Sequence, residues 1–200
     1  MKKIRIKQVN TSIRWEKVEA MSYFKFPWRS EKPPVTEFRA YYDQDNLNFQ
    51  FKAYGPSPLI YYKDNNKLDV RFSERVEIFF RTDEKMDPYY VLEIDPTGRI
   101  LDYKAKHYRS FDREWQWPDD LKLETTINDD HYLVSGNFRL NTLRSLNLLQ
   151  DQTIELGLYR GHCTEITNDK ATIKWISWID PMTATPDFHV PSSFGLLELS

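Results

Sequence analysis

Two glutamates carry the strongest hint of chemistry in this sequence. Residues 73–103 are expected to form three β-strands in succession, because apolar and polar side chains alternate along them. A register that aligns Ile78 with Leu92 would place Glu77 directly opposite Glu93 on the outer face. Like charges at opposed positions destabilise a sheet, so we expect a positive group or a bound molecule between them.

The turn after the second of these strands sets the next register. Pro96 fixes the first central φ of an Asp-Pro-Thr-Gly turn, and Gly98 tolerates the conformation that closes it. If Asp95 faces Gly98, then Glu93 shares the outer face with Asp102. Three carboxylates are therefore expected on one surface.

The composition and the spacing of turns favour an all-β protein. The 200 residues suit a single domain spanning 1–200, and 12 Tyr, 12 Phe and 6 Trp make the chain rich in aromatic residues. About a dozen short strands separated by turns predict an antiparallel two-sheet β-sandwich, immunoglobulin-like or jelly-roll-like. One short helix is expected over 141–149, where Asn141 can cap the helix and leucines recur every three residues.

Residues 36–54 predict a hairpin whose register can be read from the sequence. The turn at 43–46 pairs Tyr42 with Leu47 and thereby places Arg39 beside Gln50. The outer face of this hairpin is polar. It is either a solvated sheet surface or the floor of a binding groove.

The N-terminal stretch predicts an edge strand over 3–9, with lysines that discourage pairing with another edge. It has no apolar segment of the kind found in secretory signals. The compartment stays open: cytoplasmic for the chain as written, or periplasmic or extracellular if a signal was removed.

Charge and hydropathy exclude several classes of partner. A net charge of −2 and a pI near 6.1 argue against nucleic-acid binding through a basic surface. No apolar run approaches the roughly 20 residues of a membrane helix, so no membrane partner is expected. Cys163, the only cysteine, is expected to be a buried apolar residue without a disulfide. The sequence does not constrain the oligomeric state.

Two motifs, taken in order, resemble a known family. The first is Arg-Val-Glu-Ile-Phe-Phe at 75–80, followed by Tyr-Tyr at 89–90 and the turn at 95–98. The second is Trp-Ile-Ser-Trp-Ile-Asp-Pro at 175–181, followed by a strand that begins with Phe-Gly at 194–195. Together they resemble the carbohydrate-binding module family 9 domains over residues 11–199. The resemblance implies a β-sandwich that binds saccharides, such as those derived from xylan and other plant polysaccharides. It implies no required cofactor.

The resemblance also assigns roles to individual residues. It implies that Trp178 stacks on a sugar ring and that Glu77 accepts hydrogen bonds from sugar hydroxyls. The family's second stacking tryptophan, six residues before that glutamate, is replaced here by Arg71. The site is therefore altered or lost, unless a tryptophan on a loop supplies the second face, the candidates being Trp28, Trp115 and Trp117.

Further contacts are expected around the glutamate pair. Glu93 stands where the family's strand would offer a cationic or amide group. The internal candidates for its counter-charge are Arg39, Arg71 and Arg99, and the external candidate is a bound cation. Structural Ca²⁺ is possible because oxygen-rich calcium sites occur in the family, whereas the four histidines lack zinc-ligand spacing. His189 is expected to lock a loop by a hydrogen bond or to contact the ligand.

Two other functions stay open. Glu77, Glu93 and Asp102 on one face fit a glycoside hydrolase of the endoxylanase type, in which two carboxylates flank the scissile bond. A degenerate sandwich with a protein-interaction role is the other alternative, and an arginine such as Arg71 folded onto the glutamates would support it. Trp175 lies on the opposite strand face from Trp178 and is expected in the core.

Overall fold

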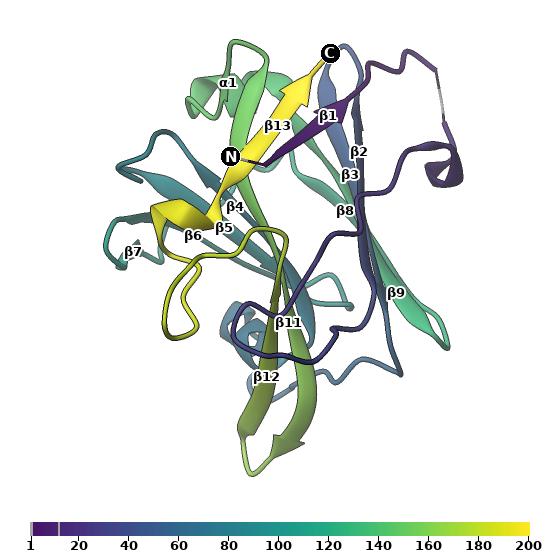
Figure 1. The fold of residues 1–200 in the computed structure, drawn as a ribbon, viewed down its shortest axis with the longest axis vertical. Helices are drawn as coiled ribbons and strands as arrows, with labels where there is room; N and C mark the ends of the chain where they lie inside the picture. Colours follow the sequence, from purple (N-terminus) through teal and green to yellow (C-terminus); the bar gives the residue numbers. More distant parts are fainter. Residues whose placement is uncertain (1, 12) are drawn as a thin grey trace.

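The strands form two sheets (Figure 1). Along each strand, successive side chains point to opposite faces. The computed structural model describes residues 2–11 and 13–200. The first sheet follows the order β1-β13-β11-β4-β5-β6-β7, with β10 and β12 also paired to β11. Its strands are β1 (Lys3–Ile6), β4 (Arg75–Arg81), β5 (Tyr89–Ile94), β6 (Ile100–Lys106), β7 (Ser110–Asp112), β10 (Leu149–Gln150), β11 (Thr153–Thr167), β12 (Lys170–Ser177) and β13 (Gly195–Leu199).

The second sheet follows the order β2-β3-β9-β8 and packs on the inner face of the first. Its strands are β2 (Thr36–Tyr42), β3 (Asn46–Tyr54), β8 (Lys122–Ile127) and β9 (His131–Arg139). Phe49, Phe51, Phe80 and Val134 belong to the core between the sheets. The predicted all-β sandwich is confirmed, and β1 is an edge strand as expected, paired in parallel with β13.

A second apolar cluster covers the outer face of the first sheet. Phe79, Val91 and Tyr159 project from the strands and pack with Phe188 and Phe194 from the connection between β12 and β13, the yellow-green loop in Figure 1. Every residue of β4 and β5 is consequently buried. The outer face of β4 and β5, where a positive group or a bound molecule is expected, is largely enclosed by loops.

The predicted registers are confirmed in two places. Glu77 pairs with Glu93 across β4 and β5. Arg39 pairs with Gln50 in the β2–β3 hairpin. Cys163 is buried as expected.

The predicted register between β5 and β6 is wrong by one residue. Glu93 pairs with Leu101, and Asp102 pairs with Leu92. The cause is that the turn is one residue longer than predicted. The Asp95 amide donates to the Arg99 carbonyl at 3.1 Å, so Asp95 is opposite Arg99 rather than Gly98. A shift of one residue moves a side chain to the opposite face. Asp102 therefore points inward, where it accepts a hydrogen bond from the Trp117 amide at 2.6 Å.

The one α-helix among the described residues is shorter than expected. It spans Leu140–Ser145 (α1), and Arg139 occupies the N-cap without a side-chain hydrogen bond. Asn141 is therefore not the cap. The helix ends because Asn147 adopts a positive φ of 57° and Leu149 enters β10. Three short 3₁₀ turns lie at Trp15–Lys17, Lys67–Phe72 and Pro191–Ser193. In the described ranges no helix is long and apolar enough to cross a membrane.

Candidate binding site

The floor of the candidate site is a buried ionic cluster on the outer face of β4 and β5. Arg75 and Glu77 are two residues apart on one strand, so their side chains share a face. Arg75 Nε lies 2.9 Å from Glu77 Oε1 and 2.7 Å from Glu93 Oε2. The three side chains are only 4%, 3% and 9% exposed. The expected positive charge between the glutamates is therefore supplied by Arg75.

The three arginines expected in this role lie elsewhere. Arg39 pairs with Glu37 at 2.7 Å on the second sheet. Arg71 is exposed in the Lys67–Phe72 turn, where its Nε donates to the Leu68 carbonyl. Arg99 pairs with Asp95 at 2.7 Å. The sequence already indicates Arg75 for this role. It lies two residues before Glu77, and residues two apart on a strand point to the same face.

The cluster is ion-paired but poorly hydrogen-bonded. Arg75 Nε, Glu77 Oε1 and Glu93 Oε2 are at ion-pair distances, yet the described residues give none of these atoms an aligned hydrogen bond. Arg75 Nη1 does donate to the carbonyls of Arg71 and Ser73, and Glu93 Oε1 accepts from the Tyr103 hydroxyl. A buried polar atom without a partner is costly, and in this floor that cost is confined to the three unpartnered atoms. Burial raises the pKa of Glu77 to about 8, with Glu93 adding to the rise and Arg75 opposing it.

Aromatic side chains form the walls above this floor. The Arg75 guanidinium lies 5.0 Å from the ring centre of Trp175, a cation–π contact. Trp28 and Phe188 pack with their ring centres 5.4 Å apart, and Trp28 Nε1 donates to the Thr183 carbonyl at 2.8 Å. Both rings line the cavity, which has a volume of about 150 Å³. The site thus combines flat rings with planar polar groups.

A glycine makes room for the floor. Gly161 on β11 stands between Arg75 and Trp175 in the sheet ladder. A Cβ atom at this position would approach Arg75 Nη1 to 2.9 Å. The absence of a side chain therefore allows the guanidinium to lie flat against the strand beside Trp175.

Charged and hydrogen-bonded residues from two loops complete the rim. Arg109 Nη2 donates to Asp187 Oδ1 at 2.8 Å, and the Tyr108 hydroxyl donates to Asp187 Oδ2 at 2.7 Å. His189 lies 2.9 Å through Nδ1 from the Tyr89 hydroxyl and also lines the cavity. Burial, helped by Arg109, lowers the pKa of His189 to about 4, so the imidazole is neutral at pH 7. Both expected roles of His189 are compatible with this position.

Trp178 is not in this site, which overturns its assignment as a stacking residue. It is 2% exposed and belongs to the core between the sheets. Its ring rests against Gly195, where an added Cβ would come within 2.6 Å. Trp175, expected in the core, faces the cavity instead. Residues three apart on an extended chain point to opposite faces, and buried Ile176 shows that the even-numbered residues face inward.

Of the three loop tryptophans proposed for the second face, only Trp28 reaches the cavity. Trp117 is buried in the inner core against Phe80 and Phe138. Trp115 packs on Tyr90 with ring centres 4.9 Å apart. Both lie on the wrong face of the first sheet, because Asp102, which holds the Trp117 amide, points inward.

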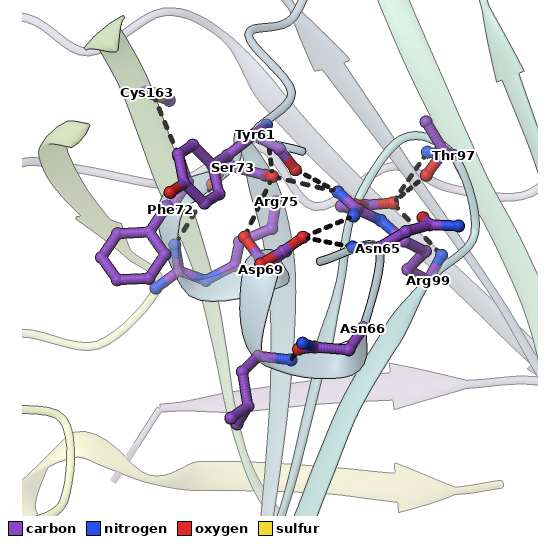
Figure 2. Close-up of polar contacts among 12 residues, drawn as sticks. Tyr61, Asn65, Asn66, Asp69, Phe72, Ser73, Arg75, Thr97, Arg99 and Cys163 are labelled. Atoms are coloured by element: carbon purple, nitrogen blue, oxygen red, sulfur yellow. Dashed lines mark hydrogen bonds and ion pairs between the residues drawn. The ribbon is translucent and has the colours of Figure 1, made fainter. Parts of the chain in front are cut away.

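Asp69, in the turn before β4, and Asp95, in the turn between β5 and β6, belong to an internal hydrogen-bond network. Figure 2 shows Asp69 beside the amide of Asn65, and Asp69 Oδ2 also accepts from the amides of Lys63 and Asp64. Arg99 donates to Asp95 Oδ2 at 2.8 Å in the same network. Within residues 2–11 and 13–200, no group of three or more His, Cys, Asp or Glu side chains is placed to hold a metal ion.

A larger cavity of about 670 Å³ lies at the edge where β1 approaches β2. It lacks paired carboxylates and has no exposed tryptophan face, since Trp178 touches it but is buried. The smaller cavity, at Trp28 and Trp175, combines aromatic rings with hydrogen-bonding groups. A polar ligand with a flat ring needs both kinds of group. The smaller cavity is therefore the candidate site.

Three solved structures share this fold. A candidate carbohydrate-binding protein of Bacteroides uniformis ATCC 8492 is 15% identical with a TM-score of 0.73, covering 100% of this chain and 99% of its own. A carbohydrate binding module family 9 domain of Caldicellulosiruptor kristjanssonii in complex with glucose is 16% identical with a TM-score of 0.58, covering 100% and 96%. A structure of such a domain from the same organism with cellotriose is 14% identical with a TM-score of 0.61, covering 99% and 93%.

A comparison with known protein families assigns nearly the whole chain to one family. No curated protein matches at a significant level. Residues 10–200 match the family described as carbohydrate family 9 binding domain-like. Since this match spans far more than half of the sequence, the chain belongs to the carbohydrate family 9 binding domain-like family.

Proposed function

We propose that the cavity between Trp28 and Trp175 binds one neutral sugar ring of a saccharide, such as one derived from plant polysaccharides, without cleaving it. The observation that carries this proposal is the convergence of Trp28, Trp175, Glu77, Glu93 and Arg75 around one cavity. Aromatic faces pack against the C–H surface of a pyranose. The family membership and the glucose and cellotriose complexes of similar domains support the same reading.

The charges around the cavity support a neutral ligand. The formal charges of Arg75 and Arg109 balance those of Glu93 and Asp187. Burial raises the pKa of Glu77, which favours the neutral carboxylic acid, a group that can both donate and accept a hydrogen bond. A charged sugar would leave its own charge uncompensated in this partly buried site. We therefore expect uronic acids and amino sugars to bind more weakly than glucose or xylose units.

The carboxylate geometry supports binding over hydrolysis. Glu77 and Glu93 both contact the same Arg75 nitrogen. In a glycosidase the two carboxylates stand on either side of the scissile bond, with the substrate between them. Here an arginine occupies the place between them, and Asp102 lies on the other face.

The test is calorimetric titration with glucose, xylose, cellotriose and xylotriose. Trp175→Ala should weaken binding by about tenfold or more, which corresponds to roughly 1.4 kcal/mol. Trp115→Ala, a partly buried tryptophan outside the site, is the matched control and should keep the affinity within about twofold, as should Arg71→Ala. Equal losses in Trp175→Ala and Trp115→Ala would contradict the site. No response to any sugar would favour the protein-interaction alternative, in which Arg75 rather than Arg71 fills the site.

A further inference from the structure

We propose that the large cavity between β1 and β2 is a second binding site, for a small organic anion with an apolar body such as an alkyl carboxylate. Its volume of about 670 Å³ lies within the range of roughly 300–1,000 Å³ typical of small-molecule sites. It shares no lining residue with the cavity at Trp175. The two sites are thus separate.

The cavity arises because the two sheets separate at this edge. β1 belongs to the first sheet and β2 to the second, and Figure 1 shows both beside the N-terminal segment. A single bridge, between Gln8 and Tyr42, joins residues following β1 to β2. Another bridge, between Met21 and Phe38, returns the N-terminal segment to β2. Residues 9, 13 and 17–21 line one wall of the cavity.

The floor of the cavity is apolar. It continues the core between the sheets, since most of its members belong to that core or pack against it. An alkyl chain placed there would remove apolar surface from water, which favours binding in proportion to the area covered. The side chains concerned are Ile4, Ile6, Met21, Phe38, Ala40 and Trp178.

The rim of the cavity is basic. Five cationic residues line it against one acidic residue, Glu19, and they are Lys2, Lys3, Arg5, Lys7 and Lys17. Lys3 and Arg5 pair with Glu198, at 2.5 Å and 3.0 Å, and by strand alternation they project from β1 on the face opposite Ile4 and Ile6, so their charges are not free for a ligand. Lys2 Nζ, by contrast, donates to the Trp178 carbonyl at 3.3 Å, beside the cavity. Lys7 and Lys17 have no ion-pair partner among the described residues and are exposed. The charge at the mouth therefore complements a carboxylate whose apolar body lies on the floor.

The competing ligand class for this cavity is a sugar, and its chemistry fits poorly. Trp178 offers no open ring face, because it is 2% exposed. The nearby carboxylate of Glu198 is engaged by Lys3 and Arg5. A cationic ligand would meet the basic rim unfavourably. An apolar anion satisfies both the floor and the rim.

The test compares decanoate with decanol, which has the same chain without the charge. Calorimetry should give one decanoate per chain, with binding about tenfold tighter than that of decanol. The double variant Lys7→Gln/Lys17→Gln should weaken decanoate binding by about tenfold and leave decanol binding unchanged. Lys170→Gln, a charge removal on β12 far from the cavity, is the matched control and should have no effect.

Two further measurements locate the ligand. Ala20→Trp, which places a large ring in the cavity, should abolish binding of both probes. Methyl resonances of Ile4, Ile6 and Met21 should shift with decanoate, and saturating glucose should not alter the titration. Absence of decanoate binding, equal affinity for decanol, or an equal effect of Lys170→Gln would overturn the proposal. Because glucose reports on the other cavity, failure here is distinguishable from failure of the sugar site.

Discussion

Two buried arginine–glutamate clusters lie on opposite faces of the first sheet and differ in how completely they are hydrogen-bonded. On the inner face, Glu74 accepts from Arg160 Nε at 2.6 Å, the Tyr132 hydroxyl at 3.1 Å and the Cys163 amide at 2.8 Å, and His162 Nδ1 lies 3.0 Å away. On the outer face, Arg75 Nη1 donates to the carbonyls of Arg71 and Ser73, and Glu93 Oε1 accepts from the Tyr103 hydroxyl at 3.4 Å. Arg75 Nε, Glu77 Oε1 and Glu93 Oε2, however, have no aligned hydrogen bond among the described residues. The first cluster is fully hydrogen-bonded and the second only in part.

The inner cluster connects the two sheets. Arg160 Nη1 donates to the carbonyl oxygens of Val35 and Tyr54 and to the hydroxyl of Thr36, at the ends of β2 and β3. A buried ionic network of this kind is a structural element when every partner is present. Buried polar atoms without a hydrogen-bond partner, rather than buried charge alone, therefore distinguish the candidate binding site.

The largest effect is expected from removing the arginine of the inner cluster, Arg160. Arg160→Met removes the cationic partner of Glu74 and leaves a buried carboxylate with fewer donors. We expect the free energy of unfolding to fall by about 3–5 kcal/mol, measured by urea denaturation. Lys63→Met, which breaks an exposed pair with Asp169, should leave stability unchanged. A loss as small as that of the control would contradict the structural role of Arg160.

The second prediction concerns Gly161, which lies beside Arg75 in the outer cluster. Gly161→Ala places a methyl group 2.9 Å from Arg75 Nη1 and so displaces the guanidinium from beneath Trp175. Sugar affinity should fall by about tenfold, while the free energy of unfolding falls by about 1–3 kcal/mol, as for other overpacked buried positions. Calorimetry and urea denaturation measure the two quantities. Unchanged affinity, or a stability loss as large as that of Arg160→Met, would remove the distinction between the clusters.

The smallest expected effect is the pH dependence of stability. Glu77 has its pKa raised from 4.5 to about 8 in the folded protein, so the folded state binds more protons than the unfolded state between these values. Stability is therefore full below pH 4.5 and is lost as the pH rises toward 8. His189, lowered from 6.5 to about 4, acts in the opposite direction only below pH 6.5.

Between pH 6.5 and 8 the Glu77 contribution is thus unopposed by His189. The free energy of unfolding should fall across this window by on the order of 1 kcal/mol, and Glu77→Gln should flatten the profile. The measurement is urea denaturation at several pH values, with Glu165→Gln, an exposed glutamate on β11 of the same sheet, as a matched substitution. A profile that keeps its slope in Glu77→Gln would contradict the assignment.

Sequence patterns predicted those features that depend on neighbouring residues within a strand or hairpin. Strand alternation placed Glu77 opposite Glu93, and the turn at 43–46 placed Arg39 beside Gln50. Both registers follow from local side-chain periodicity and turn length. The all-β sandwich follows from the same signals repeated along the chain.

The errors arose where loops or a single residue of register decide the outcome. One extra turn residue after Asp95 moved Asp102 to the inner face. The motif at 175–181 does not determine which of its two tryptophans faces the core, and Trp175 rather than Trp178 lines the cavity. The positions of Trp28 and His189 depend on connections that fold over the outer face. No local periodicity encodes such long-range packing.

The pairing of β1 with β13 has a consequence for the order of folding. Arg5 and Glu198 are in contact although they are 193 residues apart in the chain. Contacts of such high sequence separation form slowly, because closing the intervening loop costs entropy before any pairing compensates it. β1 therefore joins its sheet only after the C-terminal strand is available. The wall of the large cavity is then among the last parts of the molecule to assemble.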